Sequence, residues 1–382
     1  MRSCVGFVLL CVALLTACTR PPATAPVTPQ DGAAWHWHDI AALGVQGRAW
    51  PDTATSFERL PARARAVLSP QMWLHGQHTA GLYVGFSSNS TALRARWSLR
   101  GGALAMHHMP ASGVSGLDLY VKSEGAWRWL ATGIPRALPD NEVTLVADLP
   151  ALVPPAQREY RLYLPLYNGV ASARIGVAPG ATLAATPAAA DKPVVVYGTS
   201  IVQGAVASRP GLAYPAQLGR RLARPVLNLG FSGQCRMEPE MVALLTEIHA
   251  AAFVVDCLAN MPAAEIEART LHLVTTLRRA HPRTLIVLLE HFPYADAHLR
   301  AVHADTQLAR NQALRAAVAA LAARGIDDVV LVPTAQALFE ADGVSGADDL
   351  TVDGIHPNDR GMLLLAGVVA KVLTALLPRP QP

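Results

Sequence analysis

A serine followed much later by an Asp-x-x-His pair is the first combination in this sequence that could perform covalent chemistry. Ser200 comes directly after the apolar run 194–197, in the stretch Val-Val-Val-Tyr-Gly-Thr-Ser. Asp353 and His356 lie three residues apart in a turn that contains glycine and proline. This spacing can set a carboxylate against one imidazole nitrogen while the other faces outward, the arrangement that activates a serine hydroxyl. Each element alone also fits an ordinary cap or turn.

Acyl transfer also requires donors for the oxyanion of the intermediate, and two loops contain suitable groups. The stretch 228–234, Asn-Leu-Gly-Phe-Ser-Gly-Gln, follows a second apolar run, and glycine permits a backbone N–H to approach a substrate closely. Gly230 and Gly233 are both candidates, and the sequence does not decide between them. Asn260 follows a third apolar run and offers a side-chain amide.

The second half of the chain predicts the sheet that would bring these groups together. Mainly apolar runs alternate with helix-length stretches, which is typical of a parallel sheet covered by helices on both faces. The expected strands are 194–197, 226–229, 252–257, 285–289 and 329–332. The expected helices are about 211–223, 238–249, 263–280, 305–324 and 360–377. Ligands bind beyond the carboxyl ends of such strands, which is where the candidate residues fall.

The first half has a different pattern, with short, often alternating segments separated by Gly, Pro, Ser and Asp. About eight such segments and no long helical period predict an all-β sandwich, most simply a jelly roll. We expect this accessory domain to occupy residues 33–183. A Pro/Ala-rich joint around 184–192 separates it from a catalytic domain at 192–379.

The N-terminus is similar to the export signal of a bacterial lipoprotein. A single arginine precedes the apolar run 5–15, which is too short to span a membrane. Leu-Thr-Ala-Cys at 15–18 looks like a lipobox, so we expect residues 1–17 to be removed and Cys18 to carry lipid. Residues 18–32 then form a Pro-rich tether. The expected location is the bacterial cell envelope, on the periplasmic or outer-membrane face; a plain secretory signal with an incidental cysteine is the alternative.

Composition excludes several other classes of protein. Of the 382 residues, 51% are hydrophobic and 16% are charged, and the net charge of +4 includes no long Lys/Arg block. A folded protein that does not bind nucleic acid is therefore expected. Cys235 and Cys257 are the cysteines beyond the signal and lipobox, and the sequence leaves open whether they pair. No metal or other cofactor is expected, because ligand spacing is missing around His36, His38, His107 and His108.

The four blocks together resemble the SGNH (GDSL-type) hydrolases, whose hallmark is Ser, Gly, Asn and Asp-x-x-His in this order. The resemblance covers about residues 192–378 and implies that Ser200 is the nucleophile. It also implies that His356 is the general acid/base and that Asp353 orients it. The implied oxyanion donors are the backbone N–H groups of Ser200 and Gly233 and the side-chain amide of Asn260.

A narrower resemblance covers nearly the whole chain after the tether. The motif Gly-Leu-Asp-Leu-Tyr at 116–120 is similar to the Gly-x-Asp-Leu-Tyr motif of an SGNH subgroup that carries a leading β-sandwich. This resemblance implies a three-layer α/β/α hydrolase domain preceded by a jelly-roll-like sandwich. In the catalytic half, Gly-Thr-Ser stands where many members have Gly-Asp-Ser, and the third block lacks the usual Gly and Asp around Asn260.

The implied activity is that of a serine esterase acting on short-chain, mainly acetyl, esters without a cofactor. Related enzymes with accessory sandwiches include polysaccharide deacetylases, so O-acetyl groups on carbohydrates are the expected substrate. The alternatives are a general short-acyl esterase, lysophospholipase or thioesterase, and a non-catalytic glycan-binding lipoprotein. The candidate substrate-contacting residues, for which structural roles fit equally well, are His107, His108, Asn168, Glu290 and His291.

Overall fold

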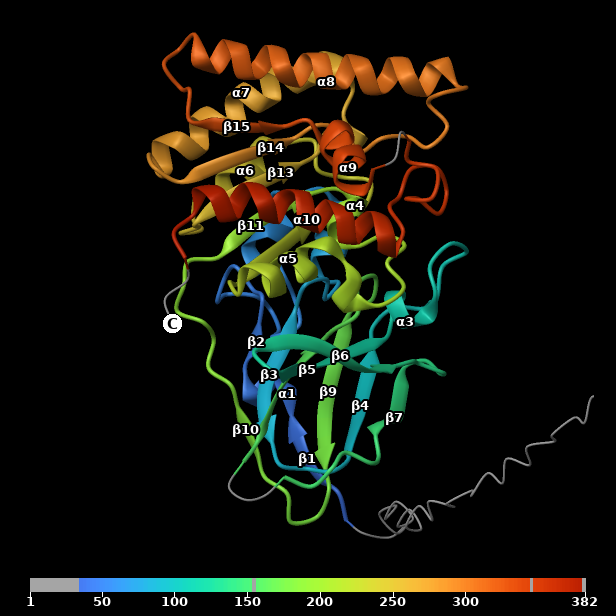
Figure 1. Cartoon of the computed structure of the whole chain (residues 1–382). Helices are drawn as coiled ribbons and strands as arrows, with labels where there is room; N and C mark the ends of the chain where they lie inside the picture. The colour runs from blue at the N-terminus through green and yellow to red at the C-terminus, as the bar shows by residue number, and fades with distance from the viewer. Residues whose placement is uncertain (1–33, 153–155, 344–345, 380–382) are drawn as a thin grey trace, which may run out of the picture.

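The computed structural model describes residues 34–152, 156–343 and 346–379. Two domains stack on one another, a β-sandwich and an α/β domain that follows it in the chain (Figure 1). The expected signal, Cys18 and the whole of the expected tether lie outside the described residues. Within the described ranges no helix has the length and apolar character needed to cross a membrane.

The N-terminal domain is a sandwich of two antiparallel sheets, as the short alternating segments predict. One sheet has the order β1 (His36–Asp39), β9 (Val170–Val177), β4 (Leu93–Leu99) and β7 (Asp140–Val146). The other has the order β10 (Leu183–Ala185), β3 (Tyr83–Ser88), β8 (Arg158–Tyr163), β5 (Leu117–Ser123) and β6 (Ala126–Gly133), with β2 (Val45–Gln46) beside β3. Alternate side chains of β4, such as Ala95 and Trp97, are buried between the sheets, which is the period of a half-buried strand.

The C-terminal domain contains the predicted parallel sheet. Its order is β12 (Val226–Gly230), β11 (Val194–Gly198), β13 (Ala252–Asp256), β14 (Leu285–Leu289) and β15 (Val329–Val332). The first three strands are buried along their whole length, which explains their nearly continuous apolar sequence. The chain begins in β11 and then proceeds to opposite sides, so the strand order reverses there. Ligands of open α/β sheets bind at such a switch point.

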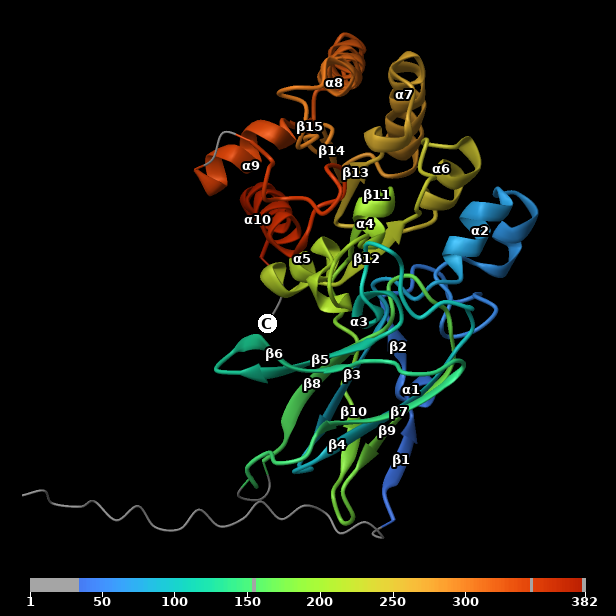
Figure 2. The same ribbon diagram turned by 90° about the vertical axis from the view of Figure 1, so that its right-hand side faces the viewer.

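Helices cover both faces of this sheet and form the outer layers of the three-layer domain (Figure 2). One face packs against α6 (Pro239–Leu245), α7 (Ala263–Ala280) and α8 (Ala301–Ala322). The other packs against α5 (Tyr214–Leu222), α9 (Thr334–Asp342) and α10 (Asp359–Leu376). Alternation along β11 divides the core, since Val195 and Tyr197 join the first layer and Val194 and Val196 the second.

The chain between β2 and β3 packs against the C-terminal domain, although it lies in the sandwich half of the sequence. It contains the 3-10 helix Ala62–Ala66 and α2 (Pro70–Gly76), and its Leu60 and Met72 join the core around β11 and α6. The Trp50 indole donates a hydrogen bond to Glu247 (2.8 Å). Burial of these apolar side chains attaches the two domains to each other.

The Gly-x-Asp-Leu-Tyr motif forms a second attachment between the domains. Asp118, fully buried in β5, accepts hydrogen bonds from the Arg209 guanidinium (2.8 Å) and the Gly211 N–H (2.8 Å) of the C-terminal domain. Arg209 also donates to the Tyr120 hydroxyl (2.7 Å). A Cβ atom at Gly116 would lie 2.4 Å from a backbone oxygen of Ser112, so the strand can begin there only with glycine. The motif therefore fixes the sandwich against the loop after Ser200.

Candidate active site

Ser200 lies where β11 turns into the short helix α4 (Ser200–Gln203) at the carboxyl edge of the sheet. Gly198 ends the strand, and a Cβ atom there would lie 2.1 Å from Cγ2 of Val202, so this tight turn requires glycine. Thr199 caps the helix, because its Oγ1 accepts a hydrogen bond from a backbone N–H of the first turn (3.4 Å). As the first helical residue, Ser200 has a backbone N–H without a partner in the helix.

The structure brings Ser200, His356 and Asp353 into one hydrogen-bonded chain. Oγ of Ser200 lies 2.9 Å from Nε2 of His356, across 156 residues of sequence. Nδ1 of the same ring lies 2.7 Å from Oδ2 of Asp353. The other carboxylate oxygen accepts the backbone N–H groups of Ile355 (3.0 Å) and His356 (2.8 Å). A serine, a base and an orienting carboxylate in this order are the geometry of an activated nucleophile.

Local hydrogen bonds fix the turn that holds the Asp-x-x-His pair. Gly354 has a φ of +84°, a conformation that favours glycine, and its N–H donates to Oγ1 of Thr351 (3.1 Å). Asn358 then caps α10 by accepting a hydrogen bond from its first turn. Partial burial of Asp353 opposes its ionisation, but the hydrogen bonds from the backbone and ring of His356 outweigh this effect and lower its pKa. Asp353 therefore stays negatively charged at neutral pH.

The loop after β12 contains both glycine candidates, and the structure distinguishes them. The N–H of Gly230 donates to Oδ1 of Asn228 (2.9 Å), and a Cβ atom at Gly230 would lie 2.0 Å from the backbone nitrogen of Gln203. Gly230 therefore allows the loop to pack against α4. Gly233 is exposed, has a φ of +69°, and its N–H has no hydrogen-bond partner among the described residues. Of these two glycines, only Gly233 has an N–H that is free to meet a substrate oxygen.

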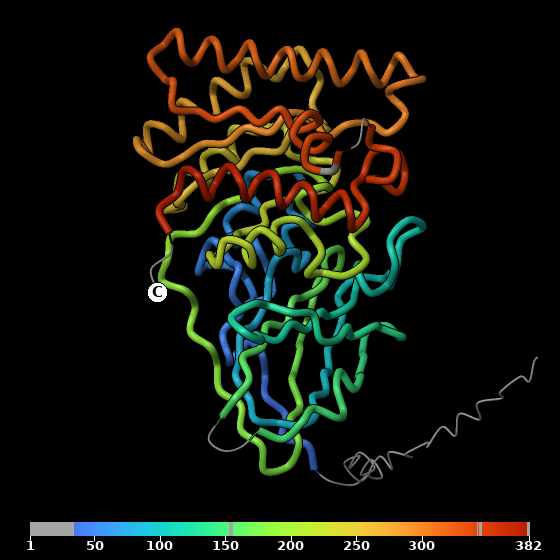
Figure 3. The backbone as a smooth tube through the Cα atoms, in the orientation of Figure 1, coloured from blue at the N-terminus to red at the C-terminus, as the bar shows by residue number. Residues whose placement is uncertain are grey.

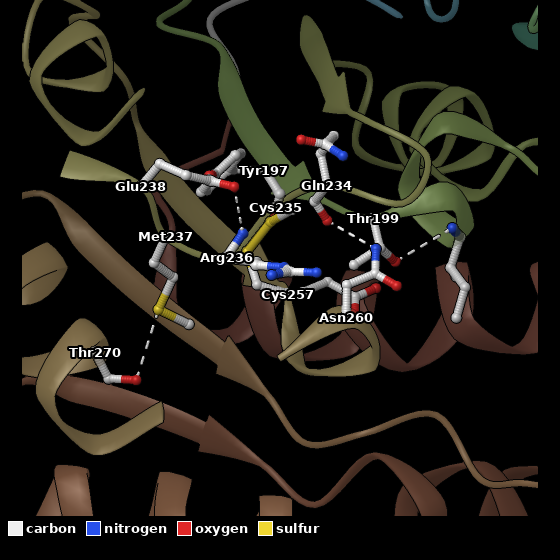
Figure 4. The surroundings of a disulfide bond; sticks show 12 residues. Tyr197, Thr199, Gln234, Cys235, Arg236, Met237, Glu238, Cys257, Asn260 and Thr270 are labelled. Carbon is white, nitrogen blue, oxygen red and sulfur yellow. Dashed lines mark hydrogen bonds between the residues drawn. A yellow bond between two sulfur atoms is a disulfide. The ribbon is translucent and has the colours of Figure 1, made fainter. Parts of the chain in front are cut away.

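Asn260 ends the 3-10 helix Leu258–Asn260, directly after β13. Its Nδ2 donates to the backbone oxygen of Gln234 (2.7 Å), the residue after Gly233 (Figure 4). The same amide that is predicted to meet the oxyanion therefore also fixes the neighbouring loop. Because β12, β11 and β13 are neighbouring parallel strands, the loops at their carboxyl ends place all three predicted donors at one edge of the sheet.

A disulfide between Cys235 and Cys257 joins the two loops that carry the predicted oxyanion donors (Figure 4). Cys235 lies two residues after Gly233, and Cys257 lies three residues before Asn260. Both sulfurs are buried, and their Cα atoms are 5.3 Å apart. The sequence leaves open whether these two cysteines pair, and the structure shows that they do. The disulfide lies beside the candidate site.

Comparison with known proteins shows the family to which the chain belongs. Residues 191–374 match the GDSL-like lipase/acylhydrolase family, and residues 35–183 match the N-terminal domain of SGNH hydrolase-type esterases, named GxDLY. A Bacteroides ovatus protein described as a GDSL-like lipase is 30% identical, with a TM-score of 0.83 over 90% of this chain and 98% of that one. The chain belongs to the SGNH (GDSL-type) hydrolases.

Two further solved structures share the fold of this hydrolase at lower identity. A salicylyl-acyltransferase from a tetracycline biosynthetic pathway is 19% identical, with a TM-score of 0.69 over 94% of this chain and all of that one. A family two carbohydrate esterase from Clostridium thermocellum, solved with cellohexaose, is 13% identical, with a TM-score of 0.54 over 78% and 94%. No curated protein matches the sequence. The hydrolase is thus an enzyme of the SGNH esterase type, with the fold class that the sequence predicts.

Arg59 and Gln203 support the Gly233 loop, and sequence reasoning missed both. The fully buried Arg59 guanidinium donates to the backbone oxygens of Asn228 (3.0 Å) and Gly230 (2.8 Å), and burial lowers its pKa to about 9. Oε1 of Gln203 accepts the Ser232 N–H (2.9 Å). Arg59 comes from the chain between β2 and β3, so no local pattern in the sequence links it to the site. Gln203 lies three residues after the nucleophile, and that spacing is the only signal.

His108 reaches the catalytic residues from the sandwich. Its ring lies edge-on to the ring of His356 with centroids 5.9 Å apart, and it stacks on His107 at 4.2 Å. Figure 3 shows the backbone before α3 (Ala111–Val114) leaving the sandwich and reaching up beside the C-terminal domain. Of the residues predicted to contact substrate, His108 and, through the stacked ring, His107 are therefore at the site.

The other three predicted contacts are wrong, because their polar groups serve the interior of the protein. The amide of Asn168 is buried and bonded to Gly101, Ala103 and Ser115 within the sandwich. Glu290 is buried and forms an ion pair with Arg315 (2.5 Å). His291 is buried, and its Nε2 lies 3.0 Å from Nη1 of Arg310. Glu290 and His291 follow β14 and therefore lie at the expected edge of the sheet, but both side chains are buried.

Proposed function

We propose that the hydrolase is a serine esterase that removes short acyl groups, mainly acetyl groups, from carbohydrates. The observation that carries this proposal is the hydrogen-bonded chain from Ser200 through His356 to Asp353, beside the unpaired N–H of Gly233. A nucleophile, its base and a candidate oxyanion donor thus lie at the same edge of the sheet.

The proposed mechanism is covalent. Oγ of Ser200 bonds to the ester carbonyl carbon while its proton passes to Nε2 of His356, and Asp353 stabilises the resulting imidazolium. The backbone N–H groups of Ser200 and Gly233 and the Asn260 amide stabilise the oxyanion. The alcohol leaves with the proton from His356, and the acyl group stays on Ser200. His356 then deprotonates a water molecule, which attacks the carbonyl carbon of the acyl-enzyme. The bond from that carbon to Oγ of Ser200 breaks, Oγ takes the proton back from His356, and the acid is released.

Three lines of support favour a carbohydrate ester. A carbohydrate esterase solved with cellohexaose shares the fold over 78% of this chain. The sandwich places His107 and His108 beside the catalytic histidine, where they can donate hydrogen bonds to hydroxyl groups of an alcohol product. An envelope location, as expected from the N-terminus, suits an enzyme that acts on glycans.

The test compares p-nitrophenyl acetate with acetylated xylan and other acetylated oligosaccharides. The chain from Ala23 onward, which keeps every described residue, is assayed beside its Ser200→Ala variant. We expect acetate release that falls by a factor on the order of 10³ or more in the variant, and a higher kcat/KM for the sugar ester. Release that does not depend on Ser200 would overturn the catalytic assignment. A phospholipid and an acyl-thioester are assayed in parallel, and a higher kcat/KM for either of them would overturn the carbohydrate assignment.

We also propose that Cys18 carries lipid and anchors the hydrolase in the bacterial envelope. The support is the lipobox-like sequence at 15–18 followed by a Pro-rich tether. In a bacterial host, the whole chain should appear in the membrane fraction, and Cys18→Ser should release it. A Cys18→Ser variant that stays with the membrane would contradict the anchor.

A further inference from the structure

Three side chains that can bind a transition metal meet at the mouth of the catalytic site. His108, Asp353 and His356 each offer one ligand atom, and these atoms all lie within 4.8 Å of one another. No other group of three or more potential His, Cys, Asp or Glu ligands occurs in the part of the chain that the structure describes. The sequence spacing argued against a metal site, because the ligands come from different domains and are about 245 residues apart in the chain.

The ligand types are suited to one class of metal. Two imidazoles and a carboxylate, with a coordination position left for water, form a set that zinc accepts. Magnesium and calcium prefer all-oxygen sites, so this set discriminates against them. Nδ1 of His108 is buried and has no hydrogen-bond partner among the described residues.

The His108 side of the cluster is held in place before any metal arrives. Met106 and Met109 exchange backbone hydrogen bonds (2.9 and 3.2 Å), which closes a tight turn with His107 and His108 at its tip. The helix α3 follows at once, and Oγ of Ser112 donates to the backbone oxygen of Ser208 in the C-terminal domain (2.6 Å). Little ordering is therefore needed for His108 to act as a ligand, which favours binding.

We propose that His108, Asp353 and His356 form an inhibitory site for Zn²⁺ and similar transition metals, which switches off the esterase by capturing its catalytic base. Either ring nitrogen of His356 gives the same result. A metal on Nε2 breaks the hydrogen bond between His356 and Ser200. A metal on Nδ1 replaces the proton between His356 and Asp353, and the Asp353 carboxylate then binds the metal instead of the imidazole. Binding does not depend on the proposed function, whereas inhibition rests on it.

Direct metal binding is tested first, in a background that needs no activity. The Ser200→Ala variant, from Ala23 onward and without a histidine tag, is titrated with Zn²⁺ by calorimetry and with Co²⁺ by visible absorption. We expect one site, a tetrahedral Co²⁺ spectrum, and at least about 10-fold weaker binding when His108→Asn is added, since losing even an outer-shell partner costs 10–100-fold. His272→Asn, which removes an exposed histidine of α7, is the matched control and should bind as before.

Two results would overturn the site. They are the absence of Zn²⁺ binding up to millimolar concentration, and binding that His108→Asn and His272→Asn affect equally. Because these measurements use a variant without the proposed nucleophile, they stand even if no esterase activity is found.

Inhibition is tested with the wild-type enzyme on p-nitrophenyl acetate. We expect Zn²⁺ to abolish the Ser200-dependent rate, a chelator to restore it, and Mg²⁺ to have no effect. The concentration for half inhibition, measured relative to the metal-free rate of each variant, should rise at least about 10-fold in His108→Asn. If Zn²⁺ binds but the rate is unchanged, the switch is wrong while the site stands.

Discussion

Asp353 determines which nitrogen of His356 is free to accept a proton. Its Oδ2 holds Nδ1 of the ring, while Oδ1 is bonded to two backbone N–H groups of the same turn. The carboxylate therefore orients both the imidazole and the turn. This double role separates an orienting carboxylate from a surface ion pair, whose contribution is usually small.

We predict that Asp353→Asn lowers kcat by a factor on the order of 10³ to 10⁴ and changes KM little. The amide can present an N–H to Nδ1, which favours the wrong tautomer and removes the negative charge beside the imidazolium. Steady-state kinetics on p-nitrophenyl acetate measure the effect. Unchanged circular dichroism and thermal midpoint would show that the turn is still folded, and a loss of less than 10-fold would contradict the assigned role.

At the scale of elements, the three loops after β11, β12 and β13 act as one unit. A hydrogen bond from Asn260 joins the loop after β13 to the Gly233 loop, and the disulfide joins the same two loops. Arg59 and Gln203 fix the backbone of this loop by hydrogen bonds to Gly230 and Ser232. Fixed donors stabilise an oxyanion better than mobile ones, because no reorganisation is needed when the charge develops.

We predict that the double variant Cys235→Ala, Cys257→Ala loses both stability and catalytic rate. Opening a loop with a sequence separation of 22 costs about 3 kcal/mol of unfolding free energy in the chain-entropy account. We also expect kcat to fall about 10-fold, less than the 10²- to 10³-fold loss of a whole oxyanion donor.

Kinetics below the melting temperature of the variant separate these two effects. The wild type treated with a phosphine reductant provides the matched comparison, since it retains both cysteines. A variant with a lower melting temperature and an unchanged kcat would show that the disulfide stabilises the domain without positioning the donors.

At the scale of the whole molecule, the sandwich and the α/β domain meet at the proposed catalytic site. Asp118 and Arg209 attach β5 to the loop that follows α4, and the His108 turn lies at the same junction. The Gly-x-Asp-Leu-Tyr motif therefore acts through docking. Among the described residues, the Asp118 carboxylate hydrogen-bonds to Arg209, Gly211 and Thr132, and none of these is a proposed catalytic residue. Site geometry depends on the orientation of the two domains.

We predict that Asp118→Asn lowers the unfolding free energy by about 3 kcal/mol, because it leaves the partly buried Arg209 guanidinium without its counter-charge. Differential scanning calorimetry should show a lower thermal midpoint. The rate on the sugar ester should fall more than the rate on p-nitrophenyl acetate, whose small alcohol does not extend to the sandwich. Asp140→Asn, at an exposed position of β7, is the control. Equal midpoints for the two variants would contradict the docking role.

The sequence by itself determined the elements and the local chemistry. All five parallel strands follow from their apolar runs to within one residue, and the Asp-x-x-His turn and its proximity to Ser200 follow from the strand pattern and the family resemblance. Both signals are local, because strand period and turn composition depend on neighbours in the chain. Local reasoning missed α9, whose nine residues carry little helical period, and the burial of Asn168.

Only the tertiary structure decided what lies next to the catalytic residues. Packing chose Gly233 over Gly230, paired Cys235 with Cys257 and brought His108 against His356. It also inserted the chain between β2 and β3, with Arg59, under the oxyanion loop. The disulfide, the Arg59–Gly230 hydrogen bond and the His108–His356 contact join residues that are 22, 171 and 248 positions apart. Their geometry follows from how the domains bury their surfaces together, and no period or motif within one segment records it.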